Sequence, residues 1–249
     1  MKKIGLFIAL FCAAMMLVSC GKKDDKVLVM ASSLDFPPYE SIDESGNPVG
    51  IDVDMAQAIC AKLGYTLKIE NMDFDSILPA VQSGKADLGI SGFTINPERE
   101  KNVDFSIPYI DAAQMILVRT GSDVKSIEDL KGKKVCGQSG TTGVDYAKEL
   151  LGEENVDAYQ SYSEVIQAVL SGKAEAAVLD DGPARAHAKA NEGKLFALDK
   201  PLTVEHYGIA FKKGNPLRDE FNTVLKELID SGEMQKFCVK HAPETFGGK

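Results

Sequence analysis

The chain has 249 residues, of which 44% are hydrophobic and 26% charged, and its formal net charge is −9. This composition is typical of a globular α/β protein, and the length fits one large domain or two lobes of roughly 100 residues each. Nucleic-acid binding needs clustered Lys and Arg, and no basic run interleaved with aromatic residues occurs. We therefore expect no nucleic-acid partner.

The first residues have the pattern of an export signal. Lys2 and Lys3 precede an apolar run of 15 residues, Ile4 to Val18, which is short for a bilayer span of about 20 residues. The run ends in "LVSC" followed by glycine, which resembles the lipobox of bacterial lipoproteins. The resemblance implies a signal peptide over residues 1–19, a lipidated Cys20 that anchors the chain to the membrane, and a flexible tether over 20–26. A plain secretory signal with a chance cysteine is the alternative.

Three cysteines remain in the mature chain, Cys60, Cys136 and Cys238. They form no CxxC motif and have no neighbouring His at metal-ligand spacing, so we expect no metal ion and no cofactor. We expect three small buried side chains, with one disulfide among them as the open alternative.

An internal repeat divides the chain into two similar halves. "ILPAVQSGKADLGIS", residues 77–91, recurs as "VIQAVLSGKAEAAVL", residues 165–179, at a spacing of 88 positions. Each half reads as strand, helix, Leu-Gly stop, strand, helix, Ser-Gly-Lys turn and strand. The predicted elements, in order, are 27–31, 54–63, 66–71, 76–83 and 87–90, then 134–137, 142–151, 156–160, 163–171 and 175–179. Ser163 with Glu164 would cap the last helix, and the alternation predicts parallel sheets covered on both faces.

Polar residues follow the ends of equivalent strands, where ligands bind in such sheets. In the first half "SGFT", residues 91–94, is followed by Arg99, and in the second half "LDDG", residues 179–182, offers two carboxylates. A guanidinium on one wall and a carboxylate on the other complement a zwitterion. A third strand end carries "GQSGTTG", residues 137–143, whose glycines let backbone N–H groups face an anion. This loop lacks the lysine of a P-loop, which argues against a nucleotide.

The same residues carry a family resemblance. "ASSLDFPPYE", "VGIDVDMAQAIC", "MDFDSILPAVQSGKADLGISGFTINPEREKNVDFSIPY", "GQSGTTG", "AVLDDGPA" and "EHYGIAFKKGN" resemble the polar amino-acid-binding proteins of bacterial ABC transporters, from about residue 27 to 246. The resemblance implies the type II periplasmic-binding-protein fold, in which two α/β lobes close on a ligand about two hinge strands. Lobe 1 would comprise residues 27–110 plus 207–249 and lobe 2 residues 111–206. The hinge strands would lie within 108–114 and 203–207, and helices within 215–238 would pack on lobe 1.

The resemblance also implies ligand contacts. Arg99 would clamp an α-carboxylate, Thr141 would hold it from the second lobe, and Asp181 would pair with the α-ammonium. The other implied polar contacts are Thr94, Ser91, Gly92 and Ser139. Phe36 and Phe74 would stack on the ligand side chain, and its pocket would be lined by Ser33, Asp35, Phe36, Phe74, Gln138 and Asp180. Taken alone, Arg99 is also consistent with a surface residue, the two phenylalanines with core, and either aspartate with a helix N-cap. Tyr39, Asp52 and Asp54 are predicted to be structural.

The sequence therefore favours a lipid-anchored receptor, expected to be monomeric, that faces the extracytoplasmic side and delivers a polar L-amino acid to an ABC permease. The alternatives are an extracytoplasmic enzyme on the same fold, similar to cyclohexadienyl dehydratase, and a receptor sensor domain. No catalytic residue is predicted, because His187, His206 and His241 have no evident acid or serine partner and GxSxG is absent. The sensor class is disfavoured because no second apolar span follows.

The implied side-chain pocket has no Lys or Arg beyond Arg99, so glutamate and aspartate should be poor ligands. A cationic side chain would gain a carboxylate, and phenylalanine faces favour a guanidinium. The predicted order is arginine, then lysine or ornithine and histidine, with glutamine as the neutral runner-up that Gln138 suits.

Overall fold

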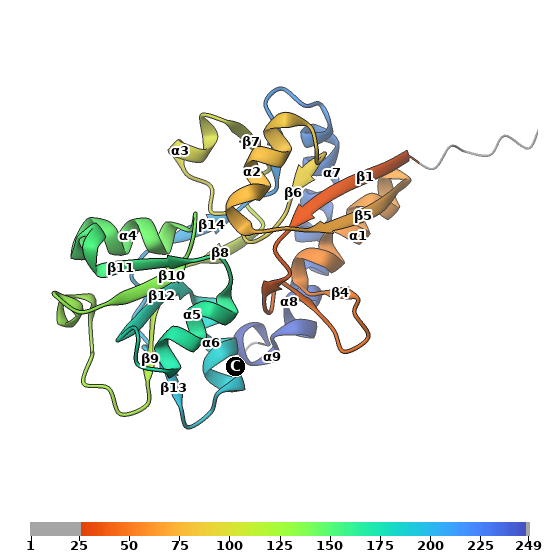
Figure 1. Cartoon of the computed structure of the whole chain (residues 1–249). Coiled ribbons are helices and arrows are strands. Elements are labelled where there is room, and N and C mark those ends of the chain that lie inside the picture. The colour runs from red at the N-terminus through yellow and green to blue at the C-terminus, as the bar shows by residue number, and fades with distance from the viewer. Residues whose placement is uncertain (1–25, 248–249) are drawn as a thin grey trace, which may run out of the picture.

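The computed structural model describes residues 26–247, and it contains two five-stranded sheets with helices packed against them (Figure 1). We name the part of the molecule built on each sheet the first lobe and the second lobe, in chain order. The first sheet has the order β5-β1-β6-β15-β7. Its strands are β1 (Lys26–Ser32), β5 (Tyr65–Asn71), β6 (Leu88–Gly89), β7 (Val103–Phe105) and β15 (Ala210–Lys212).

Helices from both ends of the described chain pack on the first sheet or on one another. They are α1 (Ile51–Leu63), α2 (Phe74–Ser83), the short α3 (Pro97–Glu100), α7 (Leu217–Asp230), α8 (Glu233–His241) and α9 (Pro243–Phe246). α1, α2 and α3 contact strands of the sheet, whereas α8 packs on α1 and α7, and α9 packs on α8. A small sheet of β2 (Asp35–Phe36), β3 (Glu40–Ile42) and β4 (Pro48–Val49) lies beside them. α1 ends where Gly64 takes the left-handed conformation, with φ 76°, as the Leu-Gly stop predicts.

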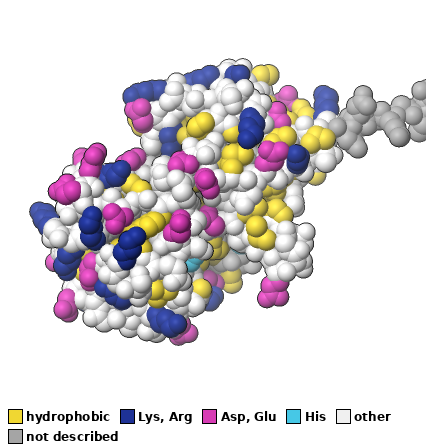
Figure 2. All heavy atoms as spheres, in the orientation of Figure 1, with side chains coloured by type: hydrophobic (Ala, Val, Ile, Leu, Met, Phe, Trp, Pro, Cys, Tyr) yellow, Lys and Arg dark blue, Asp and Glu magenta, His cyan; other side chains and the backbone are white. Residues whose placement is uncertain are grey.

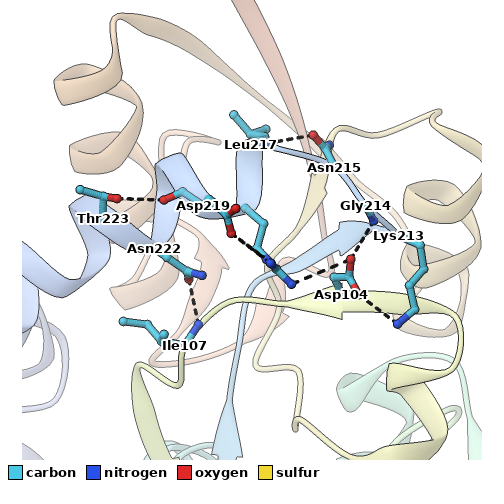
Figure 3. A network of polar contacts seen from close by, with 10 residues as sticks. Asp104, Ile107, Lys213, Gly214, Asn215, Leu217, Asp219, Asn222 and Thr223 are labelled. Atoms are coloured by element: carbon cyan, nitrogen blue, oxygen red, sulfur yellow. Dashed lines mark hydrogen bonds and ion pairs between the residues drawn. The ribbon is translucent and has the colours of Figure 1, made fainter.

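A network of hydrogen bonds and ion pairs joins the segment after the second lobe, residues 213–223, to β7 and the residues that follow it (Figure 3). The carboxylate of Asp104, in β7, accepts hydrogen bonds from Lys213 Nζ at 2.9 Å and from the Gly214 backbone N–H at 2.7 Å. Asn222 Oδ1, in α7, accepts from the Ile107 backbone N–H at 2.9 Å. The segment after the second lobe is therefore held to the first sheet by both its strand and its helix.

The second sheet has the order β11-β10-β12-β9-β13. Its strands are β9 (Gln114–Arg119), β10 (Val135–Gln138), β11 (Val156–Tyr159), β12 (Ala176–Asp180) and β13 (Leu195–Ala197). Its helices are α4 (Thr142–Leu151), α5 (Tyr162–Leu170) and α6 (Asp181–Ala190), with the 3₁₀ turns η1 (Ile127–Leu130) and η2 (Glu153–Asn155).

Two short strands connect the lobes. β8 (Ile110–Ala112) pairs antiparallel with β14 (Glu205–Tyr207), and both lie between the two sheets in Figure 1. β9 then runs antiparallel to β12, and β15 runs antiparallel to β6 and β7. The strands predicted from the repeat are parallel to one another in each sheet, as expected, and the antiparallel strands are additions that the prediction did not include. A chain that enters a sheet from the edge where the other strands end must run against them, and no crossover helix intervenes to reverse it.

The predicted helix start at Ser163 is wrong. Ser161 is the N-cap of α5: its Oγ accepts from the Glu164 N–H at 3.3 Å, and Glu164 Oε2 accepts from the Ser161 N–H at 3.1 Å. This reciprocal pair is a capping box, which needs an acid three residues after the cap. Ser161 and Glu164 have that spacing, whereas Ser163 and Glu164 are adjacent.

The three described cysteines, Cys60, Cys136 and Cys238, are free and at most 4% exposed, which confirms the prediction of small buried side chains. Within residues 26–247 no helix is long and apolar enough to cross a bilayer, and no group of His, Cys, Asp and Glu is arranged to hold a metal ion. Acidic and basic side chains are interspersed over both lobes on the face drawn in Figure 2. The predicted signal peptide and Cys20 lie outside the described residues.

Candidate functional site

A small cavity with about 210 Å³ of empty volume lies between the two lobes. The residues that line it are Phe36, Phe74, Gly92, Thr94, Arg99, Gln138, Thr141, Thr142, Tyr162 and Asp180. They come from both lobes, and eight of them are among the residues predicted from the sequence.

Arg99 supplies the positive charge of the cavity. Its Nη1 donates to the Thr94 carbonyl oxygen at 2.8 Å, and its Nη2 donates to the Gly140 carbonyl oxygen at 3.0 Å, across the gap between the lobes. Its guanidinium carbon lies 5.6 Å from the ring centroid of Phe74 and 5.3 Å from that of Phe93, so aromatic faces orient it. Two of its five N–H donors are used by these bonds, which leaves donors to bind an anion.

The N-terminus of α4 faces Arg99 from the second lobe. Thr141 is the N-cap: its Oγ1 accepts from the Val144 N–H at 3.4 Å and donates to the Gln138 carbonyl oxygen at 2.7 Å. The first N–H groups of a helix have no partner within the helix, and the helix dipole places positive charge at this end. Both the Arg99 guanidinium and the start of α4 carry positive charge, which is the chemistry that binds a carboxylate.

Asp180 supplies a carboxyl group on another wall. It is the last residue of β12, is 4% exposed, and its Oδ1 accepts from Tyr207 Oη at 2.7 Å. Burial, and then the negative charge of Glu205, raise the pKa of Asp180 to about 7. A buried carboxyl group without a cation in contact is poised to receive one.

Glu205, in the connecting strand β14, lies beneath the cavity and gathers donors from both lobes. Its Oε2 accepts from Thr94 Oγ1 at 2.6 Å, from Thr142 Oγ1 at 3.0 Å and from Gln114 Nε2 at 3.3 Å. Its Oε1 accepts from Thr203 Oγ1 at 3.1 Å. The hydroxyl hydrogen of Thr94 is therefore directed to Glu205, and the oxygen of that hydroxyl remains an acceptor for a ligand ammonium.

Asp181 does not line the cavity, although the sequence assigned the ligand ammonium to it. It is the first residue of α6, and its backbone N–H donates to the Ala113 carbonyl oxygen at 2.8 Å. The change from strand to helix falls between the two aspartates, so only Asp180 extends the strand into the cavity. Asp180 is the N-cap residue of α6, but its side chain makes no cap hydrogen bond.

Four other predicted residues lie around the cavity and do not line it. Ser91 donates to Glu40 behind the wall, and Ser139 Oγ donates to Asp75 Oδ2 at 3.0 Å across the lobes. Ser33 and Asp35 line a neighbouring, more open hollow. Asp35 Oδ2 accepts from the Tyr162 backbone N–H at 2.8 Å, which is another contact between the lobes.

The sequence reasoning missed Tyr162 and Thr142 in the cavity and Glu205 beneath it. The repeat contained a signal for Tyr162, because the spacing of 88 positions maps Phe74 onto it. Both are the first residue of their helix, and each lines the cavity. Nothing local distinguishes Glu205, since its donors come from segments up to 111 residues away.

The cavity holds one guanidinium, a helix N-terminus, a buried carboxyl group and aromatic faces, which together complement a small zwitterion. None of the three histidines lines it. His206 contacts Asp111 at 2.8 Å, His241 contacts Asp54 at 2.7 Å, and His187 stacks on Tyr162.

A family model described as bacterial extracellular solute-binding proteins, family 3, matches residues 28–244. The arginine-binding extracellular protein ArtP of Bacillus subtilis (strain 168) is 36% identical over 250 residues, covering 96% of this chain and 98% of that protein. The ABC transporter glutamine-binding protein GlnH of the same organism is 37% identical over 208 residues, covering 80% of this chain and 76% of GlnH.

Among solved structures, the arginine-, lysine-, histidine-binding protein ArtJ from Geobacillus stearothermophilus is similar with a TM-score of 0.84 and 34% identity. The match covers 90% of this chain and 96% of that chain. The predicted two-lobe, type II periplasmic-binding-protein fold is confirmed. The chain belongs to the bacterial extracellular solute-binding proteins of family 3.

Proposed function

We propose that this protein is a receptor that binds a polar L-amino acid between its lobes and delivers it to the permease of an ABC importer. The observation that carries the proposal is the opposition of Arg99 and the α4 N-terminus to Asp180 within one small cavity. The ligand carboxylate binds Arg99 and the first N–H groups of α4. The ligand ammonium binds Asp180 and the Thr94 hydroxyl oxygen.

The lobes close on the ligand about β8 and β14, with lobe 1 spanning residues 27–110 plus 207–249 and lobe 2 residues 111–206. Three hydrogen bonds between the lobes support a closed form: Arg99 to Gly140, Ser139 to Asp75, and the Tyr162 N–H to Asp35. Each of these bonds joins a group of one lobe to a group of the other, and both groups would be exposed to water if the lobes moved apart. Closure thereby removes water from the charges that hold the ligand, which strengthens their attraction.

The preferred ligand is arginine, then lysine or ornithine and histidine, with glutamine as the neutral runner-up. Asp180 and Glu205 place two acidic groups against the single guanidinium of Arg99, so a ligand with net positive charge balances the site. The faces of Phe36 and Tyr162 suit a flat guanidinium. The relatives named for arginine and for glutamine agree with this order.

The receptor is monomeric, has no enzymatic activity, and is held to the extracytoplasmic face of the membrane by lipid on Cys20. The family is extracellular, and its relatives are named as binding proteins. The lipobox pattern at residues 17–20 supports the anchor. A mixing experiment tests the absence of catalysis, because a receptor returns its ligand unchanged on denaturation and an enzyme consumes it.

Calorimetric titration tests the proposed function. The protein is unfolded and refolded to remove bound ligand, then titrated with arginine, lysine, histidine, glutamine, cystine and glutamate. Arginine should bind most tightly, and Arg99→Ala should weaken it by about 2–5 kcal/mol because a buried carboxylate loses its partner. Arg218→Ala, which removes an arginine beside Asp219 on α7, is the matched control and should bind as wild type. Glutamate binding more tightly than arginine and glutamine would refute the proposed site.

A further inference from the structure

Two buried carboxyl groups, Glu40 and Asp52, lie behind the wall of the cavity. Glu40 begins β3, Asp52 lies in the first turn of α1, and both are 0% exposed. Ser91 Oγ donates to Glu40 Oε1 at 2.5 Å. Tyr109 Oη and the Gly92 N–H donate to Asp52 Oδ2 at 2.8 and 3.1 Å.

Among residues 26–247 no cation forms an ion pair with either group. The titratable groups that act on the pair from the surrounding elements are acids, phenols and a thiol: Asp35 of β2, Tyr39, Tyr109, Tyr162 of α5 and Cys238 of α8. Two of the bases of α8, Lys240 and His241, contact Asp54. Two carboxylates buried together without a countercharge cannot both ionise at neutral pH. Burial accordingly raises the pKa of Glu40 well above its ordinary value and that of Asp52 to about 6.

The hydrogen-bond inventory identifies where a proton belongs. The side chains of Glu40 and Asp52 are hydrogen-bond partners of each other. One oxygen of each group, Glu40 Oε2 and Asp52 Oδ1, is buried and receives no other donor. A single proton between the two groups satisfies both oxygens, because a protonated carboxyl group donates and a carboxylate accepts. We propose that Glu40 is a neutral acid that donates through Oε2 to the Asp52 carboxylate, and that this pair positions the loop Ser91–Gly92, of which Gly92 lines the cavity.

The pair acts on the site through its hydrogen bonds. Ser91 is fixed between Glu40 and the Ser33 N–H, which donates to Ser91 Oγ at 3.0 Å. Gly92, with φ 58°, is held by Asp52 against Phe36, which would lie 2.4 Å from a Cβ at this position. Loss of the shared proton would place two like charges behind this close contact. This positioning role rests on the proposed ligand binding, whereas the shared proton does not.

An infrared difference spectrum of ligand-free protein tests the shared proton separately from ligand binding. Glu40→Gln replaces the neutral acid by an amide that also donates to Asp52 and accepts from Ser91. At pH 7 the wild type minus variant spectrum should show the C=O stretch of one protonated carboxyl group, and the contribution of Asp180 should cancel. A difference that shows only a lost carboxylate would overturn the shared proton.

Ligand affinity of two variants tests the positioning role. Glu40→Ala removes the donor and should weaken binding by about tenfold or more, and Glu40→Gln should restore most of it. If folded Glu40→Ala binds as wild type, the positioning role is refuted, whatever the infrared result. If Glu40→Ala does not fold, the pH profile of affinity decides. Both wild type and Glu40→Gln should weaken at alkaline pH as the ligand ammonium loses its proton, and wild type should weaken more steeply because its second carboxyl group also ionises. Parallel profiles would refute the role.

Discussion

Acidification should weaken ligand binding through Asp180. The carboxyl group of Asp180 is buried, and its pKa lies at about 7, roughly three units above the ordinary value of 3.8. At about 1.36 kcal/mol per unit, the ligand-free protein disfavours the charged form by ~4 kcal/mol. A bound ammonium needs that charged form, so every protonated molecule must release a proton before it binds.

The magnitude follows from the pKa. At pH 7 about half of the ligand-free protein has a charged Asp180, and this fraction falls further as the pH drops. Relative to its value at pH 7, the dissociation constant for arginine should therefore rise about fivefold at pH 6 and about 50-fold at pH 5. The carboxylate and ammonium of the ligand stay charged over this range. Asp52, with a pKa of about 6, also titrates in it, so the Asp180→Asn variant is needed to isolate the part due to Asp180. Calorimetry in buffers of different ionisation enthalpy should also detect about half a proton released per ligand at pH 7.

The stability of the ligand-free protein should change in the opposite direction. Because the folded pKa of Asp180 is raised, its contribution to stability is fully present below pH 3.8 and is lost as the pH rises through about 7. The Asp180→Asn protein should bind arginine weakly at every pH. Its ligand affinity and its stability should both lack the pH dependence that Asp180 causes in wild type. An arginine affinity that varies by less than threefold between pH 7 and pH 5 in wild type would refute this reasoning.

Three further predictions concern the clamp, closure and the anchor. Arg99→Lys should keep less than a tenth of the arginine affinity, because one ammonium cannot replace the planar fork; equal affinity by titration contradicts the clamp. Gly140→Ala places a Cβ 3.0 Å from Asp75 Cβ across the lobes and should weaken binding about tenfold. Gly46→Ala, with similar positive φ and open space, is its control, and equal losses would refute a block to closure. The Cys20→Ser protein should no longer be found in the membrane fraction, and its ligand affinity should be unchanged. Finding it in the membrane fraction would contradict the lipid anchor.

Elements whose ends carry chemical signals could be predicted from the sequence. The bounds of α4, 142–151, are the predicted ones, because Thr141 caps its start and the Leu151-Gly152 pair ends it. The start of α1 was predicted three residues late, at Asp54. Its actual N-cap is Gly50, which makes no side-chain cap hydrogen bond and leaves no polar signal.

The aspartate pair shows why the site was harder to predict than the fold. The resemblance implied that both contact the ligand, Asp181 at its ammonium and Asp180 at its side chain, whereas only Asp180 lines the cavity. Which one does so depends on whether the strand ends before or after Asp180, a difference of one residue. Successive side chains of a strand point to opposite faces, so this single step decides which carboxylate enters the cavity.

The two similar halves explain how one fold builds a site for a zwitterion. Strands β6 and β12 are equivalent in the two halves, and both lead to the cavity. In the first half Ser91 and Gly92 follow β6, whereas in the second half Asp180 is the last residue of β12. The backbone plan is shared, and so are the aromatic residues Phe74 and Tyr162 that begin the equivalent helices. The charges are not shared. The residue 88 positions after Arg99 is His187, which stacks on Tyr162 and does not line the cavity. Opposite charges on a repeated backbone give the cavity the polarity that a symmetric pair of lobes would lack.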